Sequence, residues 1–270
     1  MLIKLVPFIL VFLMQASYAV ELPPIQICAD PNPLEWGLDK SSAALTSIPT
    51  PTPTPGQPLS GLGISADIVS ATFTLMGRRV NFISDLPWKR CLSEVQNGHI
   101  DFAMGAYFNA ERAKIYDYSN HYNTLTPQIF YAASISAVFT SVSDLKPYRG
   151  CGMYGSSYIH YGLNEQDLDL GSGYDSLIRK LHAGRCDYFV EELEVIESLK
   201  KTGVNIFADK QIKHVAAPWA KAPSRYLITA KNGKNSALLG QINAALNTLI
   251  KSGKAEKLWN SQISDIPYKP

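Results

Sequence analysis

The sequence has little excess charge of either sign. Its 25 lysine and arginine residues nearly balance its 23 aspartate and glutamate residues, and the formal net charge is +2 at pH 7. Nucleic-acid-binding surfaces typically show basic runs interleaved with aromatic residues, and this sequence has no such run. We therefore expect no nucleic-acid partner. The apolar fraction of 46% favours a globular protein over a disordered one.

The chain also lacks an apolar run of about 20 residues, the length that a membrane-spanning helix needs. The apolar run at residues 5–14 covers about ten residues, follows Lys4 and precedes Ser17, Tyr18 and Ala19. A positive charge, a short apolar segment and small residues at positions −3 and −1 are typical of a secretory signal peptide. We expect residues 1–19 to be removed after Ala19, which places the mature protein in the periplasm. An uncleaved N-terminal anchor is the alternative.

Cysteine is scarce, with four residues in the chain. They form no CxxC pair and have no histidine at metal-ligand spacing, so we predict no metal site and no cofactor. Outside the cytoplasm cysteines are oxidised, and four of them allow three disulfide pairings. Four buried free thiols are the alternative. The residues are Cys28, Cys91, Cys151 and Cys186.

Strand and helix patterns alternate along the chain, as is typical of sheets covered by helices on both faces. The first set predicts strand, helix, strand, helix and strand at residues 25–29, 64–75, 79–84, 88–95 and 100–104. The second set predicts strands at 150–154, 186–190 and 204–207, and helices after 155–157, at 177–181 and at 191–201. A strand at 225–230, a helix capped by Ser236 and a last short helix at 254–263 follow.

Residues 47–58 alternate proline with threonine over part of their length. Such a run favours an extended polyproline conformation and cannot join a sheet or a helical core. It could be a linker between domains, but only one strand precedes it. We interpret it as an insertion in the loop between the first strand and the first helix.

Five short segments follow one another in a characteristic order. The most specific, residues 86–122, holds Pro87-Trp88, Gly98-His99-Ile100-Asp101, Asn109-Ala110-Glu111-Arg112 and Tyr116-Asp117-Tyr118-Ser119. The others are residues 63–77 with Asp67, 143–158, 181–190 and 246–259. Together they resemble family 3 of the bacterial extracellular solute-binding proteins, the group that binds polar amino acids.

The resemblance implies an α/β, two-lobed periplasmic binding protein-like fold of type II, with two α/β lobes joined by two crossover strands. Lobe 1 would be residues 20–128 plus 222–270, and lobe 2 residues 129–221. The ligand would lie in the cleft between them, and closure would bury it. The resemblance also implies the disulfides Cys28–Cys91 and Cys151–Cys186, one within each lobe.

Arg112 stands where the family places the arginine that binds the carboxylate of the ligand. A guanidinium is permanently charged and can bind a carboxylate through two hydrogen bonds. A surface arginine paired with Asp117 or Glu111 is the alternative. Asn109 replaces a family threonine and can still offer an amide. Ser156 and Ser157 would open a helix whose free N–H groups bind the same carboxylate from the opposite lobe.

The remaining candidates for ligand binding are aromatic or acidic. Trp88 matches a position where the family places an aromatic ring against the ligand, and Trp36 and Tyr107 could add further walls. Core packing is the alternative for each ring. Glu192 aligns with the aspartate that accepts the ammonium group of the ligand, or is simply an acidic helix start. Tyr107 and Gly105 replace small hydroxyl residues of the family, which argues against a standard α-amino acid ligand.

The resemblance favours a periplasmic solute-binding protein that is not an enzyme and delivers a small polar solute, amino-acid-like or carboxylate-bearing, to an ABC-type importer. We expect it to be a monomer. One alternative is a ligand-sensing or partner protein of a membrane complex. Another is an enzyme, since dehydratases and lytic transglycosylases use related lobes. Glu192 and His160 would then be candidate acid–base groups.

Overall fold

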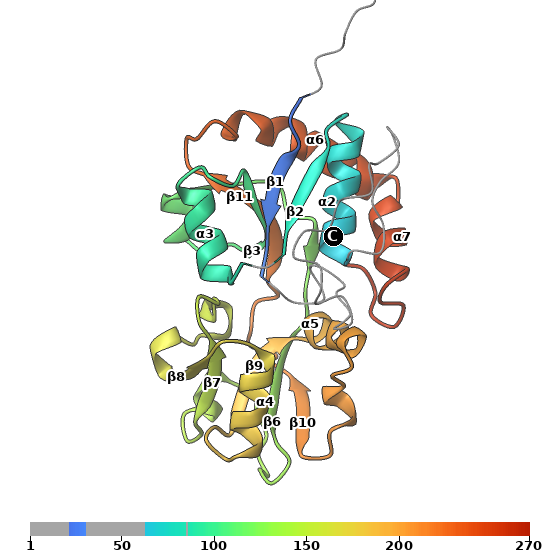
Figure 1. Cartoon of the computed structure of the whole chain (residues 1–270). Helices are drawn as coiled ribbons and strands as arrows, with labels where there is room; N and C mark the ends of the chain where they lie inside the picture. The colour runs from blue at the N-terminus through green and yellow to red at the C-terminus, as the bar shows by residue number, and fades with distance from the viewer. Residues whose placement is uncertain (1–21, 31–62, 85) are drawn as a thin grey trace, which may run out of the picture.

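The structure is a computed structural model that describes residues 22–30, 63–84 and 86–270. Within these ranges the chain forms two α/β lobes, each built on its own sheet, as Figure 1 shows. The two-lobed fold implied by the resemblance is therefore confirmed. No helix in these ranges combines the length and the apolar character needed to cross a membrane. The predicted signal peptide, Trp36 and the proline-rich residues 47–58 lie outside the described residues.

The sheet of lobe 1 has the strand order β2-β1-β3-β11-β4, and β5 also pairs with β11. The parallel part holds β1, β2 and β3, whereas β11 runs antiparallel to β3, β4 and β5. The strands are β1 (Ile25–Cys28), β2 (Val80–Ile83), β3 (Phe102–Tyr107), β4 (Tyr116–Tyr118), β5 (Asn123–Thr124) and β11 (Ser224–Ala230). Thus β11 returns to lobe 1 after the chain has built lobe 2.

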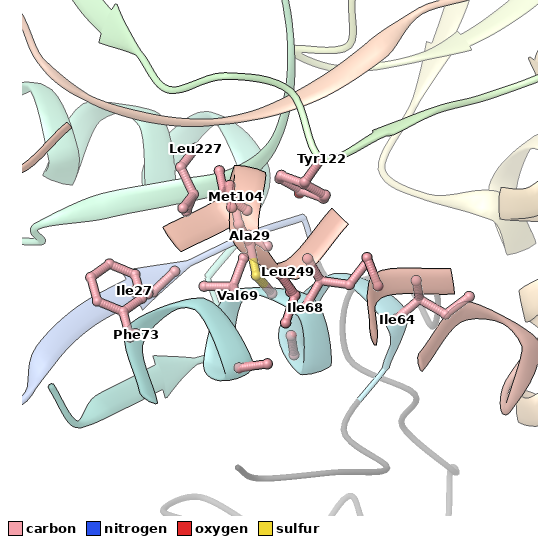
Figure 2. Packing of buried hydrophobic residues seen from close by; sticks show 14 of the residues in the cluster. Ile27, Ala29, Ile64, Ile68, Val69, Phe73, Met104, Tyr122, Leu227 and Leu249 are labelled. Carbon is pink, nitrogen blue, oxygen red and sulfur yellow. The ribbon is translucent and has the colours of Figure 1, made fainter. Parts of the chain in front are cut away.

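Helices cover both faces of this sheet. Successive strand residues point to opposite sides, so each strand supplies apolar residues to both faces. On one face Ile27 and Met104 pack against α2, α6 and α7, where Figure 2 shows Ile68 and Phe73 of α2. On the other face Cys28 packs with residues of α3. The helices are α2 (Ile64–Leu75), α3 (Trp88–Gln96), α6 (Leu239–Lys251) and α7 (Lys254–Asn260).

The sheet of lobe 2 has the order β10-β6-β9-β7-β8. Phe130 and Phe189 face α4 and α5, whereas Ile129 and Val190 pack on the opposite side. The elements are β6 (Pro127–Ala132), β7 (Gly150–Met153), β8 (Leu168–Gly171), α4 (Tyr174–His182), β9 (Tyr188–Glu192), α5 (Leu193–Ser198) and β10 (Ile212–Ala216). Short 3-10 helices complete the fold: η2 (Arg112–Lys114), η3 (Val142–Leu145), η4 (Ile159–Tyr161), η5 (Glu165–Asp167), η6 (Leu199–Thr202), η7 (Ile206–Ala208) and η8 (Ser236–Leu238).

The chain passes between the lobes twice, and the two crossings pair with each other. The N–H of Leu125 donates to the carbonyl of Pro223 at 2.9 Å, and that of Ala217 donates to the carbonyl of Pro127 at 3.2 Å. The buried carboxylate of Glu194 accepts the N–H and the hydroxyl of Thr126, each at 2.8 Å. These bonds tie helix α5 (Leu193–Ser198), which follows β9 in lobe 2, to the first crossing.

Three local predictions were wrong. No α-helix begins at residues 155–157: Gly155 has a φ of 80°, and its N–H donates to the carboxylate of Glu165. The predicted strand at 204–207 is a 3-10 turn, since the Asn205 side chain accepts the N–H of Ala208. Ser236 does not cap its helix, because its hydroxyl donates to Asp117 at 2.7 Å. In each case a side-chain hydrogen bond decides the local backbone.

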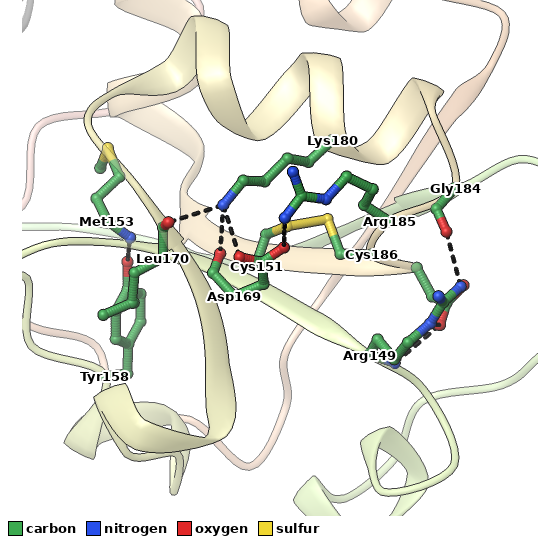
Figure 3. Close-up of a disulfide and its surroundings, with 11 residues drawn as sticks. Arg149, Cys151, Met153, Tyr158, Asp169, Leu170, Lys180, Gly184, Arg185 and Cys186 are labelled. Atoms are coloured by element: carbon green, nitrogen blue, oxygen red, sulfur yellow. Dashed lines mark hydrogen bonds and ion pairs between the residues drawn. A yellow bond between two sulfur atoms is a disulfide. The ribbon is translucent and has the colours of Figure 1, made fainter.

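The four cysteines form the two pairs that the resemblance implied. Cys28 and Cys91 have Cα atoms 5.8 Å apart and join β1 to α3. Cys151 and Cys186 have Cα atoms 5.7 Å apart and join β7 to the loop that leads into β9. Figure 3 shows this second disulfide below α4, beside ion pairs of Asp169 with Lys180 and Arg185. Each disulfide thus fastens two elements of one lobe and leaves the crossings unconstrained.

We predict that the double variants Cys28→Ala/Cys91→Ala and Cys151→Ala/Cys186→Ala each lose about 4 kcal/mol of unfolding free energy. Each disulfide restricts the conformations of the unfolded chain and so lowers its entropy. Urea unfolding with and without reductant measures the effect. Reductant should shift each double variant less than the wild type, because one bond is already absent. An unchanged wild-type midpoint under reductant would contradict a stabilising role for either bond.

Candidate ligand-binding cleft

A cavity of about 60 Å³ lies between the two lobes. Lobe 1 contributes Trp88, Tyr107, Arg112 and Arg225 to its wall, and lobe 2 contributes Ser156, Ser157, Tyr158, His160, Tyr161, Tyr174, Glu191 and Glu192. Six of the eight predicted ligand-binding residues therefore line one cavity. Asn109 is not in its wall, and Trp36 lies outside the described residues. Cationic, anionic and aromatic groups meet there, which suits a small polar ligand.

Arg112 lies just after β3 and faces the cavity beside Trp88. Its Nη1 atom donates to the carbonyl of Tyr107 at 3.1 Å, and its Cζ atom lies 5.8 Å from the centre of the Trp88 ring. A guanidinium carries five N–H donors, so this carbonyl leaves donors for a carboxylate. The side-chain oxygen of Asn109 accepts the N–H of Arg112 at 3.2 Å and that of Glu111 at 2.8 Å. Asn109 thus shapes the turn that presents the arginine.

The alternative in which Arg112 pairs with a surface acid is not what the described residues show. Glu111 forms an ion pair with Lys114 at 2.5 Å. Asp117 accepts the hydroxyl of Ser236 at 2.7 Å and the N–H of Asn232 at 2.9 Å. Both acids thus have partners away from the cavity, and the guanidinium of Arg112 stays in the cavity wall.

Glu192 ends β9 and is 1% exposed. Its Oε1 atom lies 2.8 Å from Nε2 of His160 and accepts the hydroxyl of Tyr161 at 3.2 Å. Its Oε2 atom accepts the hydroxyl of Tyr107. Burial opposes ionisation, but the hydrogen bonds from His160, Glu191 and Tyr107 outweigh it and lower the pKa of Glu192 to about 2. The cavity therefore holds a buried carboxylate rather than a solvated helix start.

Glu191 has the opposite protonation behaviour. Burial, followed by the neighbouring charge of Glu192, raises the pKa of Glu191 well above its usual value. Its Oε2 atom accepts the hydroxyl of Tyr174 at 2.8 Å, and its Oε1 atom accepts the N–H of Glu192 at 3.1 Å. The charged form is therefore favoured at Glu192 and the protonated form at Glu191, because two buried like charges in contact oppose each other.

Ser156 and Ser157 reach the cavity from a turn, not from the predicted helix. The N–H of Ser156 donates to the carbonyl of Met153 at 3.3 Å, and the N–H of Met153 donates to the hydroxyl of Tyr158 at 2.6 Å. The N–H groups of Gly155 and Ser156, which a helix N-terminus would offer to an anion, are thus used within the loop. Both serines still line the cavity.

Sequence reasoning missed Arg225, which is the second residue of the buried strand β11 and is 1% exposed. Its Nη1 atom donates to the hydroxyl of Ser65 at 2.7 Å. A charged residue at the start of a buried strand was the available signal, since arginine is rarely buried without a reason. Tyr158, Tyr161 and Tyr174 were missed as well, because tyrosine is common in protein cores.

The two-lobed architecture, with a polar cavity between lobes that the chain crosses twice, is that of a solute-binding receptor of the periplasmic binding protein type. The family model of the bacterial extracellular solute-binding proteins, family 3, matches residues 56–262. The chain belongs to this family. No curated protein sequence matches it.

Solved structures share the fold. The arginine-, lysine-, histidine-binding protein ArtJ from Geobacillus stearothermophilus is 18% identical with a TM-score of 0.69, over 91% of this chain and 97% of that one. A histidine kinase sensor domain with similarity to periplasmic binding proteins is 19% identical with a TM-score of 0.70, over 92% and 98%. A structure from work on glutathione import through GshT of Streptococcus mutans is 17% identical with a TM-score of 0.68, over 92% and 97%. At these identities the likeness shows the fold alone.

We predict opposite pH effects for Glu191→Gln and Glu192→Gln. A raised pKa means that Glu191 costs stability as the pH rises above about 4.5, the ordinary glutamate value, so Glu191→Gln should gain thermal stability relative to the wild type toward neutral pH. The lowered pKa of Glu192 means that its carboxylate stabilises the folded protein above about pH 4.5, and that this contribution is lost as the pH falls toward 2. Glu192→Gln should therefore lose on the order of 3 kcal/mol of unfolding free energy at pH 7.

Melting temperatures between pH 2 and pH 8 measure both effects. The two variants are matched, because the same substitution is made at adjacent positions of one strand. Curves for Glu191→Gln and the wild type that run parallel over this range would show that Glu191 does not carry the extra proton.

Proposed function

We propose that this protein is a periplasmic solute-binding protein that closes around a small polar solute bearing a carboxylate and delivers it to an ABC-type importer. One observation carries the proposal: the guanidinium of Arg112 in lobe 1 and the carboxylate of Glu192 in lobe 2 line the same cavity. A solute with an anionic end and a hydrogen-bond-donating end can contact both lobes at once. Such a solute favours the closed form over the open one, because it binds the two halves together only there.

The aromatic wall supports this proposal. Trp88 offers a flat face next to Arg112, and such a face binds the apolar or cationic body of a solute. The small free volume of about 60 Å³ argues for a compact solute. Family membership supports transport and a periplasmic location. Export to the periplasm requires a signal peptide, and we propose that residues 1–19 are this segment and are removed after Ala19. We also propose the lobe limits given above, 20–128 with 222–270 and 129–221.

We propose further that the protein acts by binding alone, as a monomer, and that its partner is a membrane permease. An enzyme on this fold would need a positioned acid or base at the reacting atom. Chemical change of a bound solute, followed by mass spectrometry of the solute after incubation, would contradict this part of the proposal.

The proposal predicts that Arg112→Ala weakens binding of the carboxylate solute. A thermal-shift screen of residues 20–270 with amino acids, polyamines, small carboxylates and short sugars identifies the solute. A solute at about a hundred times its Kd stabilises by roughly 2.7 kcal/mol. Removing one partner of a buried charged pair costs about 2–5 kcal/mol, which weakens binding by at least roughly 30-fold.

Arg112→Lys and Arg90→Ala are the controls. Lysine keeps the charge but loses the planar fork, so Arg112→Lys should bind with intermediate affinity. Arg90 lies two residues after Trp88 on α3, is exposed and is absent from the cavity wall, so Arg90→Ala should bind as the wild type does. A carboxylate solute whose affinity does not change in Arg112→Ala would overturn the proposed site.

A further inference from the structure

Tyr107 reaches from lobe 1 to lobe 2. Its hydroxyl donates to Oε2 of Glu192, and its ring lies edge-on to the ring of His160 with 5.5 Å between the centroids. Tyr107 ends β3 of the first sheet, whereas Glu192 ends β9 of the second and His160 lies in η4. These are side-chain contacts between the lobes, beside the two backbone crossings: Tyr107 pairs with Arg225 in the sheet of lobe 1, and Glu192 pairs with Pro127 in that of lobe 2.

An irregularity in β3 directs Tyr107 into the cleft. Ala106 pairs with Tyr226 and Ala103 with Ile228, so β3 has one residue more than β11 over this stretch. Gly105 in between has a φ of 83°, a conformation that favours glycine. Such a bulge inverts the alternation of side chains. Ala103 and Ala106 therefore share one face of the sheet, and Tyr107 turns to the cavity side.

The contact satisfies the carboxylate of Glu192 with groups of the protein itself. Oε1 has His160 and Tyr161 as partners, and Oε2 has Tyr107. Burial, together with the charges of Glu192 and Glu191, raises the pKa of Tyr107 well above its usual value, so the phenol stays a neutral donor at every physiological pH. Hydrogen bonds to a buried charge are the strong ones.

The phenol also takes up the space beside Glu192. About 60 Å³ remains in the cavity, less than half of the roughly 150 Å³ in which a protein cavity holds benzene. The two lobes also approach each other closely at Gly155. A Cβ atom at this position of lobe 2 would lie 3.5 Å from Cβ of Lys89 and 3.7 Å from Cδ1 of Trp88 in lobe 1. A solute that binds Glu192 must therefore move the phenol.

We propose that Tyr107 is an internal competitor of the solute. Its hydroxyl occupies the Glu192 carboxylate, keeps the lobes together without a solute, and restricts binding to solutes that can displace it. The displacement rests on the proposed function, whereas the closure of the solute-free protein does not. Tyr107 is thus a specificity-determining residue whose bond must break before a solute reaches Glu192.

Small-angle X-ray scattering of the solute-free mature protein tests the closure. The wild type should scatter as the closed form of the structure does. Tyr107→Phe keeps the ring and removes the donor, and losing a hydrogen bond to a charged group should shift the equilibrium between closed and open forms roughly tenfold to a hundredfold toward the open one. The radius of gyration of Tyr107→Phe should therefore exceed that of the wild type.

Tyr174→Phe is the matched control. It removes the same kind of hydroxyl from the same cavity wall, but that hydroxyl donates to Glu191 within lobe 2 at 2.8 Å. Its radius of gyration should equal that of the wild type. Glu192→Gln removes the charge of the acceptor, should open the lobes as Tyr107→Phe does, and serves if Tyr107→Phe fails to fold.

Two results would overturn the inference. One is a wild type that is already open without solute. The other is a radius of gyration that is the same in the wild type, Tyr107→Phe and Glu192→Gln. Because no solute enters the measurement, failure of the carboxylate screen leaves this test intact, and failure of this test leaves the role of Arg112 untouched.

Discussion

The cleft depends on the two places where the backbone passes between the lobes. Residues 124–127 and 217–224 pair with each other through the bonds of Leu125 to Pro223 and of Ala217 to Pro127. Neither crossing can move alone, since each holds hydrogen-bonding groups of the other. The lobes are thereby held at a common edge while the opposite edge, where Gly155 meets Trp88, depends on side-chain contacts. This arrangement suits a hinge.

The crossing is also joined to the chemistry of the cavity. Glu194 holds Thr126 at the hinge, and Glu192, two residues earlier, holds His160, Tyr161 and Tyr107. A short stretch of chain at the end of β9 thus supplies both the acid that fixes the hinge and the acid that faces the cleft. Rotation of the lobes and changes around Glu192 are expected to be coupled, because only one residue separates the two acids in the chain.

The family architecture is kept here with an altered cavity. The disulfides lie within the lobes, so they stabilise each half without restricting the hinge. The bulge at Gly105 places a tyrosine where it faces the opposite lobe, and Arg225 adds a buried guanidinium to the wall beside the half-buried Arg112. Core positions tolerate only volume-conserving change, whereas a cleft wall can change its chemistry without loss of the fold.

Much of the fold could be predicted from the order of short motifs, because apolar periodicity reports which residues must be buried. Arg112, Trp88 and Glu192 were placed in one cavity by resemblance alone. The helix expected after Gly155 was wrong, since a left-handed glycine and the side chains of Tyr158 and Glu165 satisfy the backbone there instead. The sequence signal for Arg225 was a charge near the start of a buried strand, and it did not place the residue in the cavity, because that depends on which strand returns to lobe 1.

The sequence by itself determined the signal-peptide pattern of residues 1–19, the alternation of strands and helices, the cysteines available for pairing and the family to which the chain belongs. These are local or linear properties, and residue type and spacing suffice for them. Only the tertiary structure decided that Tyr107 meets Glu192, that the pKa values of Glu191 and Glu192 shift in opposite directions, and that Arg225 lines the cavity. Such facts depend on contacts between residues distant in the chain, and on the burial that those contacts create.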